Sequence, residues 1–181
     1  MALEPKGRWL EQAHHCFSPF QGPRPDPADI SLLVIHNITL PPGQFGAPYI
    51  QQLFLGCLQP DHPSLVALAG LEVSAHLLIR RDGSLVQFVP FDRRAWHAGV
   101  SVFEGRAGCN DYSIGIELEG GDHIPYNDEQ YQSLAGVTRA LFRQYPLLTP
   151  DRIAGHCDIA PDRKTDPGPA FDWARYRSLL D

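Results

Sequence analysis

Leu32-Leu33-Val34-Ile35-His36 is the stretch that decides the fold of this chain. Four apolar residues follow one another without alternation, and a histidine ends the run. An uninterrupted apolar run predicts a strand that is buried on both faces, as happens when a sheet is covered from each side. We therefore expect a central strand here. The histidine at its end is a candidate site residue, because strand ends in open sheets are where binding sites collect.

A second strand is predicted at Ser113–Glu119, where apolar and polar residues alternate. The two isoleucines and the leucine share one face of this strand, whereas the serine, the glycine and both glutamates share the other. The apolar face is expected to pack on the core.

Turn chemistry and periodicity predict the remaining elements. Residues 75–80 and 85–89 flank an Asp-Gly turn and form a β-hairpin. Helices are expected from about Pro48, with an apolar stripe continuing to residue 58, after the capping residue Asn127, and from Asp172. This mixture predicts an α/β (α+β) fold, in which a central mixed β-sheet is flanked by helices.

The length of 181 residues fits one domain. We expect a single domain over residues 1–181, in which residues 1–30 form a lead-in segment and residues 18–29 run over the surface. Four widely separated cysteines without a CxxC motif indicate free thiols in a reducing compartment.

Charge and hydropathy exclude several classes of partner. The formal charge of −6 and the pI of about 5.7 argue against nucleic acid and against an anionic membrane, since both reward a basic face. No stretch has the composition of a signal peptide or the length of a membrane span. We therefore expect a cytoplasmic protein, and we expect it to be a monomer.

Three side chains that are far apart in the sequence are candidates for a metal site: His36, His156 and Asp166. Two neutral imidazoles and a carboxylate form a good ligand set for Zn²⁺ with one coordination position left open, which is the arrangement of a catalytic site. Their spacing is not a local zinc motif, so the residues alone leave open the alternative of hydrogen-bonded structural histidines.

Two further groups are candidates for the chemistry. Lys164 is expected on the same side of an extended segment as Asp166, where its ammonium would stabilise an oxyanion; the alternative is a surface ion pair. Glu117 lies in an otherwise apolar strand, where burial would raise its pKa toward the range of a general base. Glu119 shares its face and is the main competitor for that role.

A cysteine nucleophile is another possibility in this sequence. It would be Cys109 or Cys157, with His97 or His156 as its base. Cys157 and His156 are adjacent, so their side chains point apart in an extended chain, which weakens that pairing.

Several longer motifs carry a resemblance to a known family. They are Leu33–Gly46, Val73–His76, Arg94–Ser101, Cys109–Asp111, Ser113–Gly120, Gly155–Pro161 and Phe171–Trp173. In these motifs the chain resembles the zinc N-acetylmuramoyl-L-alanine amidases, and among them the bacterial enzymes of cytoplasmic peptidoglycan recycling. The wider superfamily includes peptidoglycan recognition proteins and phage amidases. The resemblance extends from about Leu32 to the C-terminus.

The resemblance implies a mixed-sheet fold with Zn²⁺ in a cleft. It implies that His36, His156 and Asp166 bind the metal, that Glu117 is the general base and that Lys164 stabilises the transition state. Many relatives have cysteine where this chain has Asp166, whereas the recycling enzymes have aspartate, so this position agrees with the narrower resemblance.

The resemblance also implies a substrate. It would be an anhydromuramyl peptide, cut between the lactyl carbonyl of 1,6-anhydro-N-acetylmuramic acid and L-alanine, and this activity would indirectly limit β-lactamase induction. Asn37 and Arg163 match positions that contact substrate, and Arg163 would bind a peptide carboxylate. Glu72 and Gly108 depart from relatives that have arginine there.

A binding module is the alternative from another functional class. Superfamily members that recognise peptidoglycan without cutting it have typically lost a metal ligand, and this chain retains all three expected ligands. About one zinc per purified chain would favour the enzyme.

Overall fold

The computed structural model describes residues 1–4 and 7–180. Within these residues the centre of the molecule is a six-stranded sheet with the strand order β1-β5-β4-β9-β3-β10. Its strands are β1 (His14–His15), β3 (Leu32–Ile38), β4 (Leu77–Ile79), β5 (Leu85–Gln87), β9 (Ser113–Glu119) and β10 (Ile153–Gly155). Only β4 and β5 are antiparallel neighbours, so the sheet is mixed, and the predicted hairpin is confirmed.

Two small antiparallel pairs, the long helix α2 and several short helices surround this sheet. The pairs are β2 (Gln21–Pro23) with β6 (Arg93–Ala95), and β7 (Val102–Phe103) with β8 (Arg106–Ala107). The α-helices are α1 (Tyr49–Phe54), α2 (Asp128–Gln144), α3 (His156–Ile159) and α4 (Trp173–Ser178). The 3-10 helices are η1 (Pro63–Leu68), η2 (Cys109–Asp111) and η3 (Pro150–Arg152).

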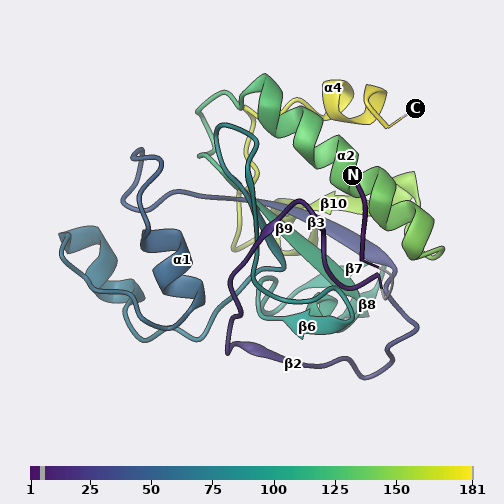
Figure 1. Ribbon diagram of the computed structural model, residues 1–181, viewed down its shortest axis with the longest axis horizontal. Coiled ribbons are helices and arrows are strands. Elements are labelled where there is room, and N and C mark those ends of the chain that lie inside the picture. Colours follow the sequence, from purple (N-terminus) through teal and green to yellow (C-terminus); the bar gives the residue numbers. More distant parts are fainter. Residues whose placement is uncertain (5–6, 181) are drawn as a thin grey trace.

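Helices flank the sheet, which confirms the predicted fold class. Figure 1 shows α2 with α4 beside it along one side of the sheet, and α1 apart from them. Within the described residues, no helical segment combines the length and the hydropathy that a membrane span requires.

The face of the sheet under α2 is mainly apolar. Leu33 and Ile35 of β3 belong to the same buried cluster as Ile114 and Ile116 of β9. The apolar side chains of α2, among them Leu134, pack against these strand residues and complete the cluster. Every second residue of the two central strands therefore supports α2.

The opposite face of the same strands is also covered. Leu32 and Val34 pack in a second cluster with Tyr112, which confirms that the run at 32–35 is buried on both faces. His36 lies two residues beyond Val34 and shares its side. All seven residues of β9 are buried. The polar residues of its alternating pattern therefore face a covered site rather than solvent.

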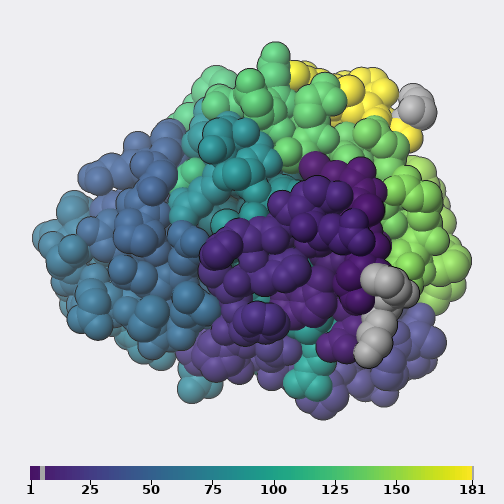
Figure 2. All heavy atoms as spheres, viewed as in Figure 1, coloured from purple at the N-terminus to yellow at the C-terminus, as the bar shows by residue number. Residues whose placement is uncertain are grey.

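Residues 25–28 are exposed, as predicted for the surface segment 18–29, but other N-terminal residues pack into the fold. Leu10 is fully buried, and β1 adds a parallel strand to β5 at one edge of the sheet. Arg24 is 4% exposed and donates to the carbonyl oxygens of Phe91 and Ser113 at 3.0 and 2.8 Å. Figure 2 shows this segment, in purple, lying against later parts of the chain. Its Pro- and Gly-rich composition hid contacts that depend on distant residues.

The helix predicted from Pro48 is shorter than expected. Helix α1 ends at Phe54, and its apolar stripe does not continue as a helix to residue 58. Gly56 adopts a left-handed φ of +72°, a conformation that ends helices. The other predicted starts are confirmed: the Asn127 amide donates to the Gln130 side chain at 3.1 Å, and the Asp172 side chain caps α4.

Candidate active site

Three segments bring the predicted ligand atoms together. His36 lies near the end of β3, and His156 is the first residue of α3, directly after β10. Strands β3 and β10 are parallel neighbours, so their ends meet at one edge of the sheet. Asp166 lies in the loop beyond α3. The two Nδ1 atoms are 3.0 Å apart, and each is 3.1 Å from Asp166 Oδ2.

This triangle of atoms has the dimensions of a zinc site. A tetrahedron with metal–ligand bonds of about 2.0–2.1 Å has edges of about 3.3 Å between ligand atoms, close to the observed separations. Among the histidine, cysteine, aspartate and glutamate side chains of the described residues, His36, His156 and Asp166 form the group whose donor atoms lie close enough together to hold a metal. The donors thus suit Zn²⁺ in number, type and spacing.

The protonation states of these ligands agree with metal binding. Burial lowers the pKa of His36 to about 4, so its ring is neutral at neutral pH. Burial alone would raise the pKa of Asp166, but hydrogen bonds with His156 and His36 hold it below its ordinary value. A neutral imidazole and an ionised carboxylate are the forms that bind a metal.

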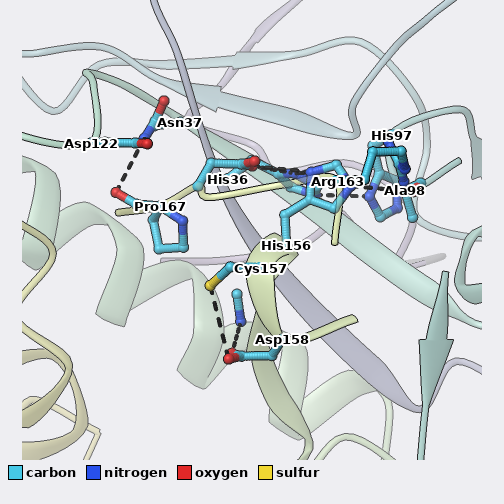
Figure 3. A network of polar contacts seen from close by, with 12 residues as sticks. His36, Asn37, His97, Ala98, Asp122, His156, Cys157, Asp158, Arg163 and Pro167 are labelled. Atoms are coloured by element: carbon cyan, nitrogen blue, oxygen red, sulfur yellow. Dashed lines mark hydrogen bonds and ion pairs between the residues drawn. The ribbon is translucent and has the colours of Figure 1, made fainter. Parts of the chain in front are cut away.

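The outer nitrogens of both histidines are also engaged. His156 Nε2 lies 3.2 Å from the Ala98 carbonyl oxygen, and His36 Nε2 lies 2.9 Å from His97 Nδ1. Figure 3 shows these groups side by side. The sequence singled out His97 as a possible partner for a cysteine and as part of the Arg94–Ser101 motif. Its contact with His36 joins residues 61 positions apart, so no local pattern could have revealed it.

Glu117 stands beside this cluster on the neighbouring strand. Strands β3 and β9 pair with His36 opposite Glu117, and both residues line one cleft of about 300 Å³. Among the described residues, its Oε2 atom is buried without a hydrogen-bond partner. Burial, and after it the charge of Asp166, raises the pKa of Glu117 well above its ordinary value, whereas Lys164 lowers it.

Glu119 has a different environment from Glu117. It is 2% exposed and accepts from Arg80 Nη1 and the Gly46 amide, both at 2.7 Å. The Arg81 amide donates to its second oxygen at 3.2 Å. This carboxylate is therefore held by structural contacts, which disfavours it as the competing base.

Lys164 lines the same cleft as Glu117 and Asp166. The alternative of a Lys164–Asp166 surface pair is not favoured, because no ion pair between these two side chains occurs in the described part of the chain. The role of Lys164 in stabilising the transition state stays a prediction.

The two predicted substrate contacts lie in or next to this cleft. Asn37 lines it and donates through Nδ2 to Asp122 Oδ1 at 2.8 Å and to the Pro167 carbonyl at 3.1 Å, as Figure 3 shows. Arg163 lines an adjoining cleft together with Glu72. Its Nη2 donates to the carbonyl oxygens of Ala98 and Val100, both at 2.8 Å.

The two departures from relatives have different settings. Glu72 lies in that adjoining cleft, where an acidic group changes the charge next to Arg163. Gly108 has a φ of +74° at the start of η2, a conformation in which a larger side chain is strained.

The cysteine alternative finds little support in the geometry. Cys109 is fully buried and lies 3.3 Å from the Tyr112 hydroxyl. Burial, and then the charge of Asp158, raises the pKa of the Cys157 thiol, whereas a nucleophile needs a lowered pKa.

Comparison with known proteins agrees with this site. Residues 26–169 match the model of the N-acetylmuramoyl-L-alanine amidase family, Amidase_2. The chain is 60% identical over 179 residues to the 1,6-anhydro-N-acetylmuramyl-L-alanine amidase AmpD of Salmonella typhimurium strain SL1344, covering 98% of this chain and 95% of that protein.

Two solved structures extend the comparison. A crystal structure of a selenomethionine derivative of AmpD matches with a TM-score of 0.95 and 57% identity, over 100% of both chains. The amidase AmiD from E. coli, in complex with the substrate anhydro-N-acetylmuramic acid-L-Ala-D-gamma-Glu-L-Lys, matches with a TM-score of 0.62 and 28% identity. That match covers 98% of this chain and 65% of AmiD.

The chain therefore belongs to the N-acetylmuramoyl-L-alanine amidase family and is a hydrolase of amide bonds. Within that family, its similarity to AmpD over nearly the whole chain confirms the narrower resemblance drawn from the sequence motifs.

Proposed function

We propose that this protein is a zinc-dependent amidase that cuts the bond between 1,6-anhydro-N-acetylmuramic acid and the L-alanine of a stem peptide. The observation that carries the proposal is the convergence of His36 Nδ1, His156 Nδ1 and Asp166 Oδ2 at 3.0–3.1 Å. The names of the AmpD relatives and the ligand of the AmiD complex support the choice of substrate.

In this proposal His36, His156 and Asp166 hold one Zn²⁺ ion. When bound, zinc supplies a Lewis acid that polarises a carbonyl and lowers the pKa of a water molecule to about 7. Two neutral imidazoles and one carboxylate would leave a net charge of about +1 on the centre, which favours attack on a neutral amide.

Glu117 moves the proton in this reaction. Its buried carboxylate accepts a proton from the attacking water at Oε2, the atom without a protein partner, and delivers it to the leaving amine of L-alanine. The raised pKa makes Glu117 basic enough to take the proton and acidic enough to return it. Lys164 contributes a positive charge that stabilises the oxyanion as the lactyl carbonyl becomes tetrahedral.

Asn37 and Arg163 would orient the substrate on either side of this centre. Asn37 lines the same cleft as the three metal ligands, where its side chain could hydrogen-bond to the sugar or to the scissile amide. The protein contacts of the Arg163 guanidinium within the described residues use Nη2, so Nη1 and Nε are left to donate to a peptide carboxylate.

We infer the biological setting from the same substrate. A monomeric enzyme that degrades anhydromuramyl peptides in the cytoplasm would act in peptidoglycan recycling. By limiting the pool of these peptides, it would indirectly limit β-lactamase induction. No contact with nucleic acid or membrane is part of this proposal.

Mass spectrometry of an anhydromuramyl tripeptide incubated with the purified protein tests the proposal. We expect release of the free tripeptide, loss of this activity with a chelator, and recovery when zinc is added back. Metal analysis should find about one zinc per chain. Activity that resists the chelator but is stopped by a thiol reagent would favour the cysteine hydrolase. Peptide binding without cleavage or zinc would favour the binding module.

A further inference from the structure

One short turn contacts the outer edge of both metal-site histidines. This turn, residues 97–98, follows β6 and Trp96. His97 Nδ1 lies 2.9 Å from His36 Nε2, and the Ala98 carbonyl oxygen lies 3.2 Å from His156 Nε2. The two histidines, one in β3 and one in α3, are thus both contacted by two adjacent residues of a third segment.

The positions of the hydrogens follow from these contacts. His36 and His156 both direct Nδ1 toward Asp166, so as neutral ligands they carry their hydrogen on Nε2. His36 therefore donates to His97 Nδ1, which must be free of hydrogen. Neutral His97 then carries its hydrogen on Nε2 and donates it to Ser113 Oγ at 3.1 Å. His156 donates to the Ala98 carbonyl, so one tautomer is fixed at every ring.

The turn itself is held by contacts that leave it little freedom. The Asn110 side-chain oxygen accepts from the amides of His97 and Ala98, at 3.1 and 2.8 Å. The His97 ring packs against Gly115 of β9, where a Cβ atom would lie 2.4 Å from it. A glycine is thus required on the strand that carries Glu117.

We propose that residues 97–98, fixed by Asn110, form a positioning element that sets the tautomer and ring orientation of both histidine ligands. His97 is a positioning residue in this scheme, because it acts through His36. The inference rests on the metal centre of the proposed function.

Two substitutions of His97 separate positioning from packing. His97→Asn keeps an acceptor, since Oδ1 of asparagine is bonded to Cγ as Nδ1 of histidine is, but it loses the ring. His97→Phe keeps the ring volume but loses the acceptor. Both lose the contact with Ser113 Oγ, so Ser113→Ala measures that contribution separately.

The first readout is the zinc dissociation constant, measured by competition with a chromophoric chelator. We expect His97→Phe to weaken zinc binding about 10- to 100-fold, as is usual when the partner of a ligating histidine is removed. His97→Asn should retain most of the affinity. The reverse order, with Phe harmless and Asn harmful, would mean that His97 only fills space and would overturn the proposal.

The second readout needs no metal. Long-range ¹H–¹⁵N spectra of the metal-free protein report which ring nitrogen of His36 carries the hydrogen. Without metal, Asp166 Oδ2 competes as an acceptor for a hydrogen on His36 Nδ1. We therefore expect a larger fraction of Nε2–H in the wild type and in His97→Asn than in His97→Phe. A wild type that binds no zinc would defeat the proposed function, whereas these spectra would still decide the role of His97.

Asn110→Ala tests the anchoring of the turn. We expect zinc binding to weaken although all ligands and His97 are intact, because both histidine partners lose their fixed position. Circular dichroism establishes that the variant is folded. Unchanged zinc affinity in this folded variant would remove Asn110 from the proposal.

Discussion

The two faces of the central strands β3 and β9 have different tasks, although they are built from alternate residues of the same segments. Toward α2 the strands present Leu33, Ile35 and Ile116, which are fully buried and purely apolar. On the other face lie His36 and Glu117, which are also buried but polar.

The difference shows how this fold combines stability with a reactive site. Burial of one large apolar side chain contributes about 1.5 to 3 kcal/mol, so the α2 face stabilises the strands. A buried polar group destabilises unless it is paired, and Glu117 Oε2 is unpaired among the described residues. The apolar face therefore offsets the cost of a carboxylate that is left available for chemistry.

Glu117→Gln should abolish most of the activity without weakening the apolar packing against α2. We expect turnover to fall roughly 100- to 10,000-fold, because an amide cannot accept the proton from water. Zinc content should stay near one per chain. The free energy of unfolding should not decrease, since the change removes an unpaired buried carboxyl group. Steady-state kinetics, metal analysis and urea unfolding measure the three quantities.

The outcome that would contradict this assignment is also specific. Near-normal turnover in Glu117→Gln would move the general base elsewhere. A large loss of zinc would show that Glu117 supports the metal site rather than the proton transfer. Either result would weaken the division of tasks between the two faces.

Ile116→Ala tests the opposite face one residue away. The variant should lose about 2 to 5 kcal/mol of stability, because it leaves a cavity between the sheet and α2. Turnover per folded molecule should change little, since Ile116 points away from the cleft. Urea unfolding measures the loss of stability. Steady-state kinetics, divided by the zinc-loaded protein concentration, measure the turnover per folded molecule. Ile116→Val is the matched control and should cost only about 0.5 to 1.5 kcal/mol.

The sequence predicted the elements whose signals are local. The apolar run at 32–35, the Asp-Gly hairpin and the caps at Asn127 and Asp172 all appear as expected. Each depends on residues that are close in the chain, where periodicity and turn chemistry act directly.

What the sequence missed depends on long-range pairing. The alternation of β9 indicated one buried face, but the other face is covered as well, for example where the His97 ring packs against Gly115. The Pro-rich N-terminal segment gave no sign that Arg24 would be buried by carbonyls more than 60 positions away. The role of His97 likewise depends on partners outside its own segment. Such contacts exist only once the fold has formed.

Glu119→Gln should have a smaller effect than Glu117→Gln or Ile116→Ala. It compares two glutamates that lie on the same face of β9. Glu119 is the other glutamate of β9, and its oxygens are taken by Arg80 and by the Gly46 and Arg81 amides. We expect a loss of about 1 to 3 kcal/mol in unfolding free energy, because the partly buried Arg80 guanidinium loses its charged partner. Turnover should fall far less than in Glu117→Gln, since this carboxylate holds structure and does not move a proton. If instead turnover collapsed while stability stayed constant, Glu119 would be the base, and a fully paired carboxylate would have to leave its partners in every catalytic cycle.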